Sequence, residues 1–79
     1  MLELFNFLNN IQTAIGNNCE VAFRKDKFSL ILRIGWWDTN FHFQYIIPDE
    51  KIAQITDVSV IENYIIQLAI HRYENKIES

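Results

Sequence analysis

The stretch from residue 28 to residue 47 has the most informative pattern of hydrophobic and polar positions in the chain. Two alternating runs flank the segment Trp36-Trp37-Asp38-Thr39-Asn40, and this pattern predicts a β-hairpin. A sheet with one face in water alternates cleanly between apolar and polar residues, but here apolar residues also occupy the second face. We therefore expect one face of the hairpin to lie in the core and the other to contact a partner.

The two-residue period of a strand assigns each side chain to one face of the sheet. The expected core face carries Phe28, Leu30, Leu32, Ile34, Trp36, Phe41, Phe43, Tyr45 and Ile47. The expected outer face carries Ala22, Arg24, Ile31, Arg33, Trp37, His42, Gln44 and Ile46. An earlier alternating run predicts a first strand with Cys19, Val21 and Phe23 facing inward.

Helices are predicted on both sides of these strands. Apolar residues at three- and four-residue spacing indicate a helix over residues 2–16, which Gly16 and the following asparagines end. After the third strand, Pro48-Asp49-Glu50 is typical of the start of a short helix, since proline suits the first turn and carboxylates suit its positive end.

A long amphipathic helix is predicted to reach about residue 75, capped either by Ser59 with Glu62 or by Asp57. The predicted fold class is therefore α+β. It comprises a three-stranded antiparallel sheet with an N-terminal helix and a long C-terminal helix, in the order α-β-β-β-α, with a short extra helix after strand three.

The last helix has a second apolar stripe beside the first, formed by Ile66, Ile70, Tyr73 and Ile77. One sheet cannot cover both stripes, so either the first helix packs on the second stripe or another protein chain does. Anchors at this spacing suit pairing of helices across a two-fold axis. These four residues are therefore the predicted contacts of a possible homodimer.

Composition and charge narrow the classes of function. The 79 residues are 49% hydrophobic and 22% charged, which predicts one folded domain over residues 1–79. The net charge of -3 is opposite to the basic footprint of a protein that tracks phosphates, so nucleic acid is the weaker candidate partner. The lone Cys19 fits a reducing compartment, and the apolar run Leu4–Leu8 lacks a basic leader. We expect a cytoplasmic protein without a signal peptide or a membrane span.

The residues that carry enzyme or metal chemistry are few and scattered. Cys19, His42 and His71 have no metal-ligand spacing, and Cys19 has the inward phase of a strand, where a thiol is inert packing. Asp49 and Glu50 are adjacent, so they cannot face each other as an acid/base pair, and helix-start electrostatics explains both. The chain is expected to be no enzyme and to use no metal or cofactor.

A binding surface on the outer face of the sheet is the stronger hypothesis, since tryptophan and arginine beside aliphatic residues match interface composition. The predicted partner-binding residues are Trp37, Arg33, Ile31, His42, Gln44 and Ile46. The alternative is that a loop or the helix after Pro48 covers this face, or that one tryptophan staples the hairpin. Trp36 is assigned to the core and Trp37 to the partner.

The element order resembles that of double-stranded RNA-binding domains, although the last helix opens with Asp57, Ser59 and Glu62 instead of a basic start. In length, acidity and helix-sheet-helix layout, the chain also resembles small accessory proteins of phages and mobile elements of low-GC bacteria, including anti-CRISPR inhibitors. The 13 isoleucines and 8 asparagines, encoded by A/T-rich codons, fit such a source. No functional residue is carried over from either resemblance.

Three hypotheses of function follow from these observations. The first is a non-enzymatic protein-binding module, encoded by a phage or mobile element, that inhibits or regulates a host or phage protein. The second is a nucleic-acid-binding module that uses the outer sheet face with Arg24, Arg33, Lys25 and Lys27. The third is a homodimeric structural or accessory protein.

Overall fold

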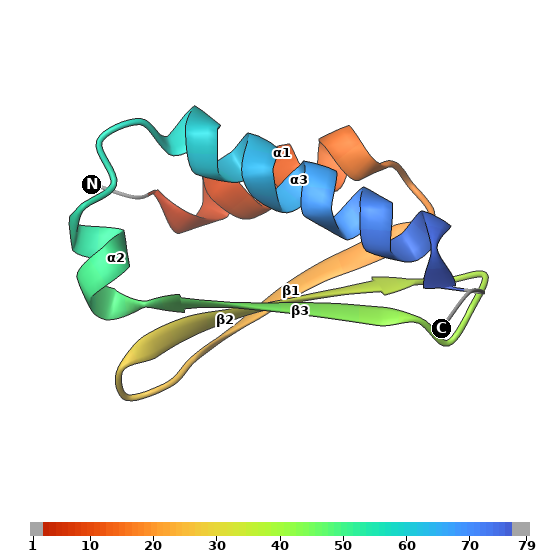
Figure 1. The fold of residues 1–79 in the computed structure, drawn as a ribbon, viewed down its shortest axis with the longest axis horizontal. Helices are drawn as coiled ribbons and strands as arrows, with labels where there is room; N and C mark the ends of the chain where they lie inside the picture. Colours follow the sequence, from red (N-terminus) through yellow and green to blue (C-terminus); the bar gives the residue numbers. More distant parts are fainter. Residues whose placement is uncertain (1–2, 77–79) are drawn as a thin grey trace.

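The computed structural model describes residues 3–76, and its elements follow the predicted order, so the fold class is α+β (Figure 1). The helices are α1 (Leu4–Ile15), α2 (Asp49–Ala53) and α3 (Val58–Glu74). The strands are β1 (Cys19–Lys25), β2 (Ser29–Trp36) and β3 (His42–Pro48). Figure 1 shows α1 and α3 over the same side of the sheet, with α2 at the end of β3.

The sheet is antiparallel in the order β1-β2-β3, so β2 is central and the other two strands are edges. β1 pairs with β2 from Cys19 opposite Trp36 to Lys25 opposite Leu30, and β3 pairs with β2 from Gly35 opposite His42 to Ser29 opposite Pro48. The core lies between the sheet and the helices. Its buried members are Phe7, Ile11, Cys19, Leu30, Leu32, Ile34, Trp36, Phe43, Ile47, Ile65 and Ala69.

Side chains cap the N-terminal ends of α1 and α3. Glu3 accepts a hydrogen bond from the N–H of Asn6 at the start of α1, and Asp57 accepts one from the N–H of Ser59 at the start of α3. Asp57 is therefore the cap of α3, while Glu62 accepts from the side chain of Asn10 and joins α3 to α1 (3.0 Å). Gly16 ends α1 at a φ of 128°, a conformation that favours glycine.

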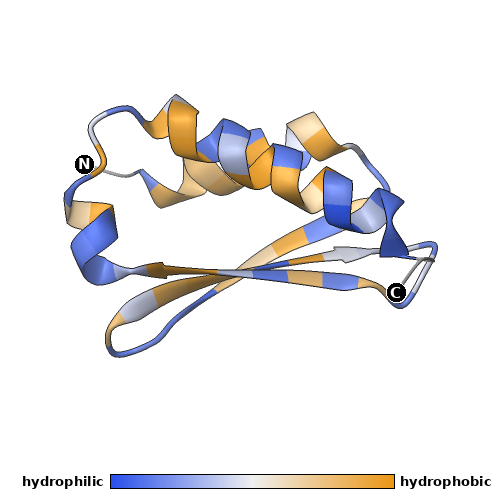
Figure 2. Cartoon of the chain, viewed as in Figure 1, coloured by the Kyte–Doolittle hydropathy of each residue, from blue (hydrophilic) through white to orange (hydrophobic). Residues whose placement is uncertain are grey.

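Two residues at the tip of the β1–β2 hairpin that were expected on the core side are exposed. Phe28 precedes β2 and is 74% exposed, and Phe23 is also exposed although its neighbour in the ladder is the buried Leu32. In Figure 1 the hairpin tip bends away from α1 and α3, so these two helices do not cover its inner face. Figure 2 shows that the tip itself is hydrophilic. By contrast, Trp36 is 4% exposed, which confirms its place in the core.

Candidate functional site

The candidate site is the outer face of the sheet, opposite the face that α1 and α3 cover (Figure 1). It carries Glu20, Ala22 and Arg24 of β1, Ile31, Arg33 and Gly35 of β2, and His42, Gln44 and Ile46 of β3. The ladder places the predicted residues next to one another: Ile31 lies opposite Ile46, and Arg33 lies opposite Gln44. The short helix α2 is not seated on this face, because it lies at the end of β3 (Figure 1).

The centre of the outer face is apolar. Ile31 is only 8% exposed although no helix covers it, because its cross-strand neighbours Arg24 and Ile46 flank it on both sides. Ile46 itself remains 53% exposed. Between β1 and β3 lies a shallow hollow of about 270 Å³, lined by Ala22, Phe23, Arg24, Ile31, Arg33 and Gln44. A partner side chain that entered it would meet apolar groups of Ala22, Phe23 and Ile31 next to Arg24 and Arg33.

The two arginines beside this hollow have no acidic partner. Within residues 3–76, the side chain of neither Arg24 nor Arg33 forms a hydrogen bond or an ion pair, and both residues are exposed. Glu20 lies on the same face but forms no ion pair with either. With two arginines and one glutamate, this face is net positive, whereas the whole chain carries a net charge of -3. The positive charge of the sheet face is thus left available to an anionic group.

His42 lies over Gly35 at one end of the outer face. A Cβ atom at Gly35 would come within 2.8 Å of Nδ1 of His42, so the absence of a side chain at position 35 makes room for the imidazole. Glu20, Ala22 and Arg33 line a second hollow with these two residues. The predicted site residue His42 therefore belongs to the same surface as Arg33.

Trp37 lies one residue beyond the end of β2. Its backbone N–H donates to the carbonyl of Asn18 (2.8 Å), which extends the β1–β2 ladder by one pair. The residue is 66% exposed, whereas the adjacent Trp36 is buried. Trp37 thus adds a large exposed aromatic group at the end of the sheet nearest Gly35 and His42.

The predicted dimer stripe of α3 lies largely against the protein itself. Ile66 and Tyr73 pack on the core, and Ile70 is half-buried, while Ile77 lies outside the described residues. α1 and α3 are in contact with each other, and pairing of this stripe with a second chain stays a prediction. The ring of Tyr73 stacks on Trp36, and its hydroxyl donates to Asp38 (2.7 Å).

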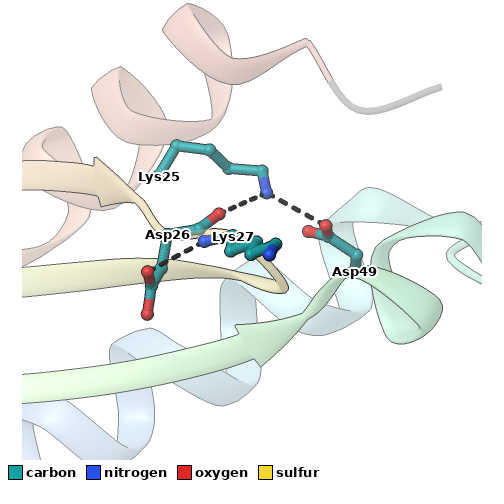
Figure 3. Close-up of polar contacts among 4 residues, drawn as sticks. All are labelled: Lys25, Asp26, Lys27 and Asp49. Atoms are coloured by element: carbon teal, nitrogen blue, oxygen red, sulfur yellow. Dashed lines mark hydrogen bonds and ion pairs between the residues drawn. The ribbon is translucent and has the colours of Figure 1, made fainter.

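Both lysines of the hairpin tip, Lys25 and Lys27, contact other residues of the same chain. Figure 3 shows Nζ of Lys25 between the carbonyl of Asp26 (2.8 Å) and the carboxylate of Asp49 (3.0 Å). The ammonium of Lys27 lies 5.5 Å from the centre of the Phe28 ring. Lys25 therefore ties the hairpin to the start of α2. Of the four predicted cations, Arg24 and Arg33 have no such side-chain contact among the described residues.

Cys19 is a buried thiol at the start of β1. Its Sγ lies 3.5 Å from the carbonyl of Gly16 and 3.9 Å from the side chain of Gln12. Burial raises the pKa of this thiol, which disfavours the reactive thiolate. The part of the chain from residue 3 to residue 76 contains no group of three His, Cys, Asp or Glu side chains that could hold a metal ion. Cys19 has the surroundings of a structural residue.

Sequence reasoning did not single out Gln12, which covers part of an edge of the sheet. Its Nε2 donates to the carbonyl of Cys19, and its Oε1 accepts from the N–H of Val21 (3.3 Å). The signal was present, because Gln12 is a polar residue in line with Leu8 and Ile15 on the apolar side of α1. The reason for a polar residue at this position becomes clear only from the structure, in which β1 lies beside α1.

No protein family, curated protein or solved structure matches this chain. None of the helices in the described range is long and apolar enough to cross a membrane.

Proposed function

We propose that this protein is a non-enzymatic, cytoplasmic binding module that docks an acidic, partly apolar segment of another protein on the outer face of its sheet. The observation that carries the proposal is the pair of unpaired arginines, Arg24 and Arg33, beside the apolar centre at Ile31. Carboxylates of the partner would pair with the two guanidinium groups, and an apolar side chain would enter the hollow between them. Trp37 would extend the contact at the end of the sheet.

The rest of the chain supports an acidic protein partner over a nucleic acid. Lys25 forms an ion pair with Asp49, so among residues 3–76 the cations without an ion pair on this face are Arg24 and Arg33. Tight binding of a phosphate backbone needs more positive charge than two arginines supply. The chain's net charge of -3 would oppose a polyanion at longer range. A folded segment that presents one or two carboxylates beside an aliphatic or aromatic residue suffers far less repulsion.

A role as an inhibitor or regulator of a host protein, encoded by a phage or mobile element, is part of this proposal. Its support is the small size, the acidity and the exposed outer face of the sheet, which together suit a protein that acts by occupying another surface. Cys19 supports the non-enzymatic role, since the nearest polar groups to its thiol are a backbone carbonyl and an amide rather than a general base.

The test is selection of a random peptide display library against the purified protein, after which the affinity of each enriched peptide is measured for the wild type and for an Arg24→Ala/Arg33→Ala variant. We expect enriched peptides that combine Asp or Glu with apolar residues and that lose about tenfold or more in affinity for the double variant. Arg72→Ala, which removes an exposed charge from α3, is the matched control and should bind as the wild type does.

A second arm measures binding of a fluorescent oligo-dT strand over a series of salt concentrations. Tight binding with a steep salt dependence, together with no enrichment of acidic peptides, would replace the proposal with the nucleic-acid-binding alternative. Enriched peptides that bind the double variant unchanged would also contradict it, because the two arginines would then have no part in recognition.

A further inference from the structure

The two edge strands of the sheet, β1 and β3, differ in how their outward backbone groups are protected from pairing with another strand. At the β1 edge, the side chain of Gln12 takes up the carbonyl of Cys19 and the N–H of Val21, and the strand carries the charged residues Glu20, Arg24 and Lys25. Charged residues and covering side chains are common protections against pairing with another strand. At the β3 edge, residues 42–47 include no Asp, Glu, Lys or Arg, and Pro48 comes only at the end.

Within residues 3–76, the outward backbone groups of β3 have no hydrogen-bond partner. The N–H of Asp49 donates to Phe28 and the carbonyl of Phe41 accepts from Trp36, so the odd-numbered residues of β3 face β2. The even-numbered residues His42, Gln44 and Ile46 therefore direct their N–H and C=O groups away from the sheet. Between residues 3 and 76, nothing donates to or accepts from these groups.

Exposed apolar side chains gather beside this open edge. Ile46 lies on its outer face, and on the helical side Tyr64 of α3 meets the ring of Tyr45 with centroids 6.0 Å apart. Val60 lies one turn before Tyr64 on α3, and both are exposed. An added strand would therefore have apolar groups to contact above and below the plane of the sheet.

We propose that the occupant of this edge is a second copy of the chain, joined through antiparallel β3 strands across a two-fold axis at Gln44. This register pairs all three open residues: Gln44 lies opposite Gln44 of the second copy, and His42 lies opposite Ile46 in both directions. On the helical side, it places Phe43 opposite Tyr45 of the second copy, an aromatic cross-strand pair. No like charges face each other.

The dimer would contain one continuous sheet of six strands, three from each copy. A two-fold axis perpendicular to the sheet keeps both helical layers on one side, so Val60 and Tyr64 of the two copies would approach each other. The outer faces would join into one surface of double width. This interface is distinct from the α3 stripe, and it is independent of the proposed acidic partner.

The test measures the mass of the purified chain by sedimentation and by native mass spectrometry, without any partner. The wild type should be a dimer at micromolar concentrations. Gln44→Lys and Gln44→Glu should each raise the dissociation constant by about tenfold or more, because like charges would then lie directly opposite each other. Mixing the two variants should restore dimerisation in the form of a heterodimer, because the introduced lysine of one copy then lies opposite the introduced glutamate of the other.

Ala22→Lys is the matched control, because it adds the same charge to the same face on the other edge strand and should remain dimeric. Circular dichroism and a thermal melt check that the variants fold, which the exposure of Gln44 favours. A monomeric wild type would overturn the proposal. So would a dimer that Gln44→Lys leaves intact, or two monomeric variants that form no heterodimer when mixed.

Discussion

The ring of Tyr73 stacks on the indole of Trp36, with their centroids 4.5 Å apart and their planes 15° apart. The hydroxyl of Tyr73 also donates to Asp38, in the turn between β2 and β3, and the ammonium of Lys76 lies 3.7 Å from the centre of the tyrosine ring. One side chain near the end of α3 thus contacts the core, the turn and the residues that follow the helix. These contacts hold the C-terminal end of α3 against the sheet.

Substitutions at Tyr73 separate the ring from its hydroxyl. Tyr73→Phe keeps the stack on Trp36 and loses the hydrogen bond to Asp38, whereas Tyr73→Ala loses both. We expect the free energy of unfolding to fall in the order wild type, Tyr73→Phe, Tyr73→Ala, as measured by urea denaturation. Equal values for the wild type and Tyr73→Phe would show that the hydroxyl contributes no stability.

The same contact predicts a dependence on alkaline pH. The hydrogen bond to Asp38 raises the pKa of Tyr73 above the ordinary value of 10.0. Its contribution to stability is therefore complete below about pH 10 and is lost as the pH rises through the raised pKa. The pKa of Tyr45 is also raised, by burial, so the informative quantity is the difference between the wild type and Tyr73→Phe. That difference should shrink at alkaline pH, and a constant difference would contradict the assignment.

The adjacent tryptophans form a matched pair of substitutions. Trp36→Ala removes a buried ring from the core and should cost about 3–5 kcal/mol of unfolding free energy. Trp37→Ala should change stability by less than about 0.5 kcal/mol, because the residue is exposed. Denaturant unfolding followed by circular dichroism measures both. A large loss of stability in Trp37→Ala would assign this residue to the fold and remove it from the binding surface.

Gln12→Ala tests the cover on the β1 edge. It leaves the carbonyl of Cys19 and the N–H of Val21 without their side-chain partner, which should cost about 1–3 kcal/mol. Hydrogen exchange should also become faster at the amide of Val21, whereas the amide of Arg24, which faces β2, should change less. Unchanged exchange at Val21 would indicate that solvent replaces Gln12 at no cost.

Much of the fold was predictable because it depends on local chemistry. The two-residue alternation gave the three strands and the helical spacing gave α1 and α3, since hydrogen-bond geometry sets both periods. Pro48-Asp49-Glu50 gave the sixth element, α2, through the residue preferences of a helix start. The outer-face residues Ile31, Arg33, Gln44 and Ile46 followed from the same alternation, and the ladder confirms their shared face. Their function stays a prediction, because periodicity identifies a face without identifying what binds there.

The burial and contacts of other residues could not be predicted, because they depend on the length of each element and on the sheet edge that it contacts. Phe28 has the phase of a core residue but is exposed at the hairpin tip, and Gln12 has the phase of a core residue but meets the open backbone of β1. The contacts of Tyr73 could not be predicted either, because its partners Trp36 and Asp38 are distant in sequence. The sequence by itself determined the elements, their order and the two faces of the strands, which arise from neighbouring residues. Only the tertiary structure decided which positions are covered, because coverage depends on the lengths and placement of segments that meet only in the folded chain.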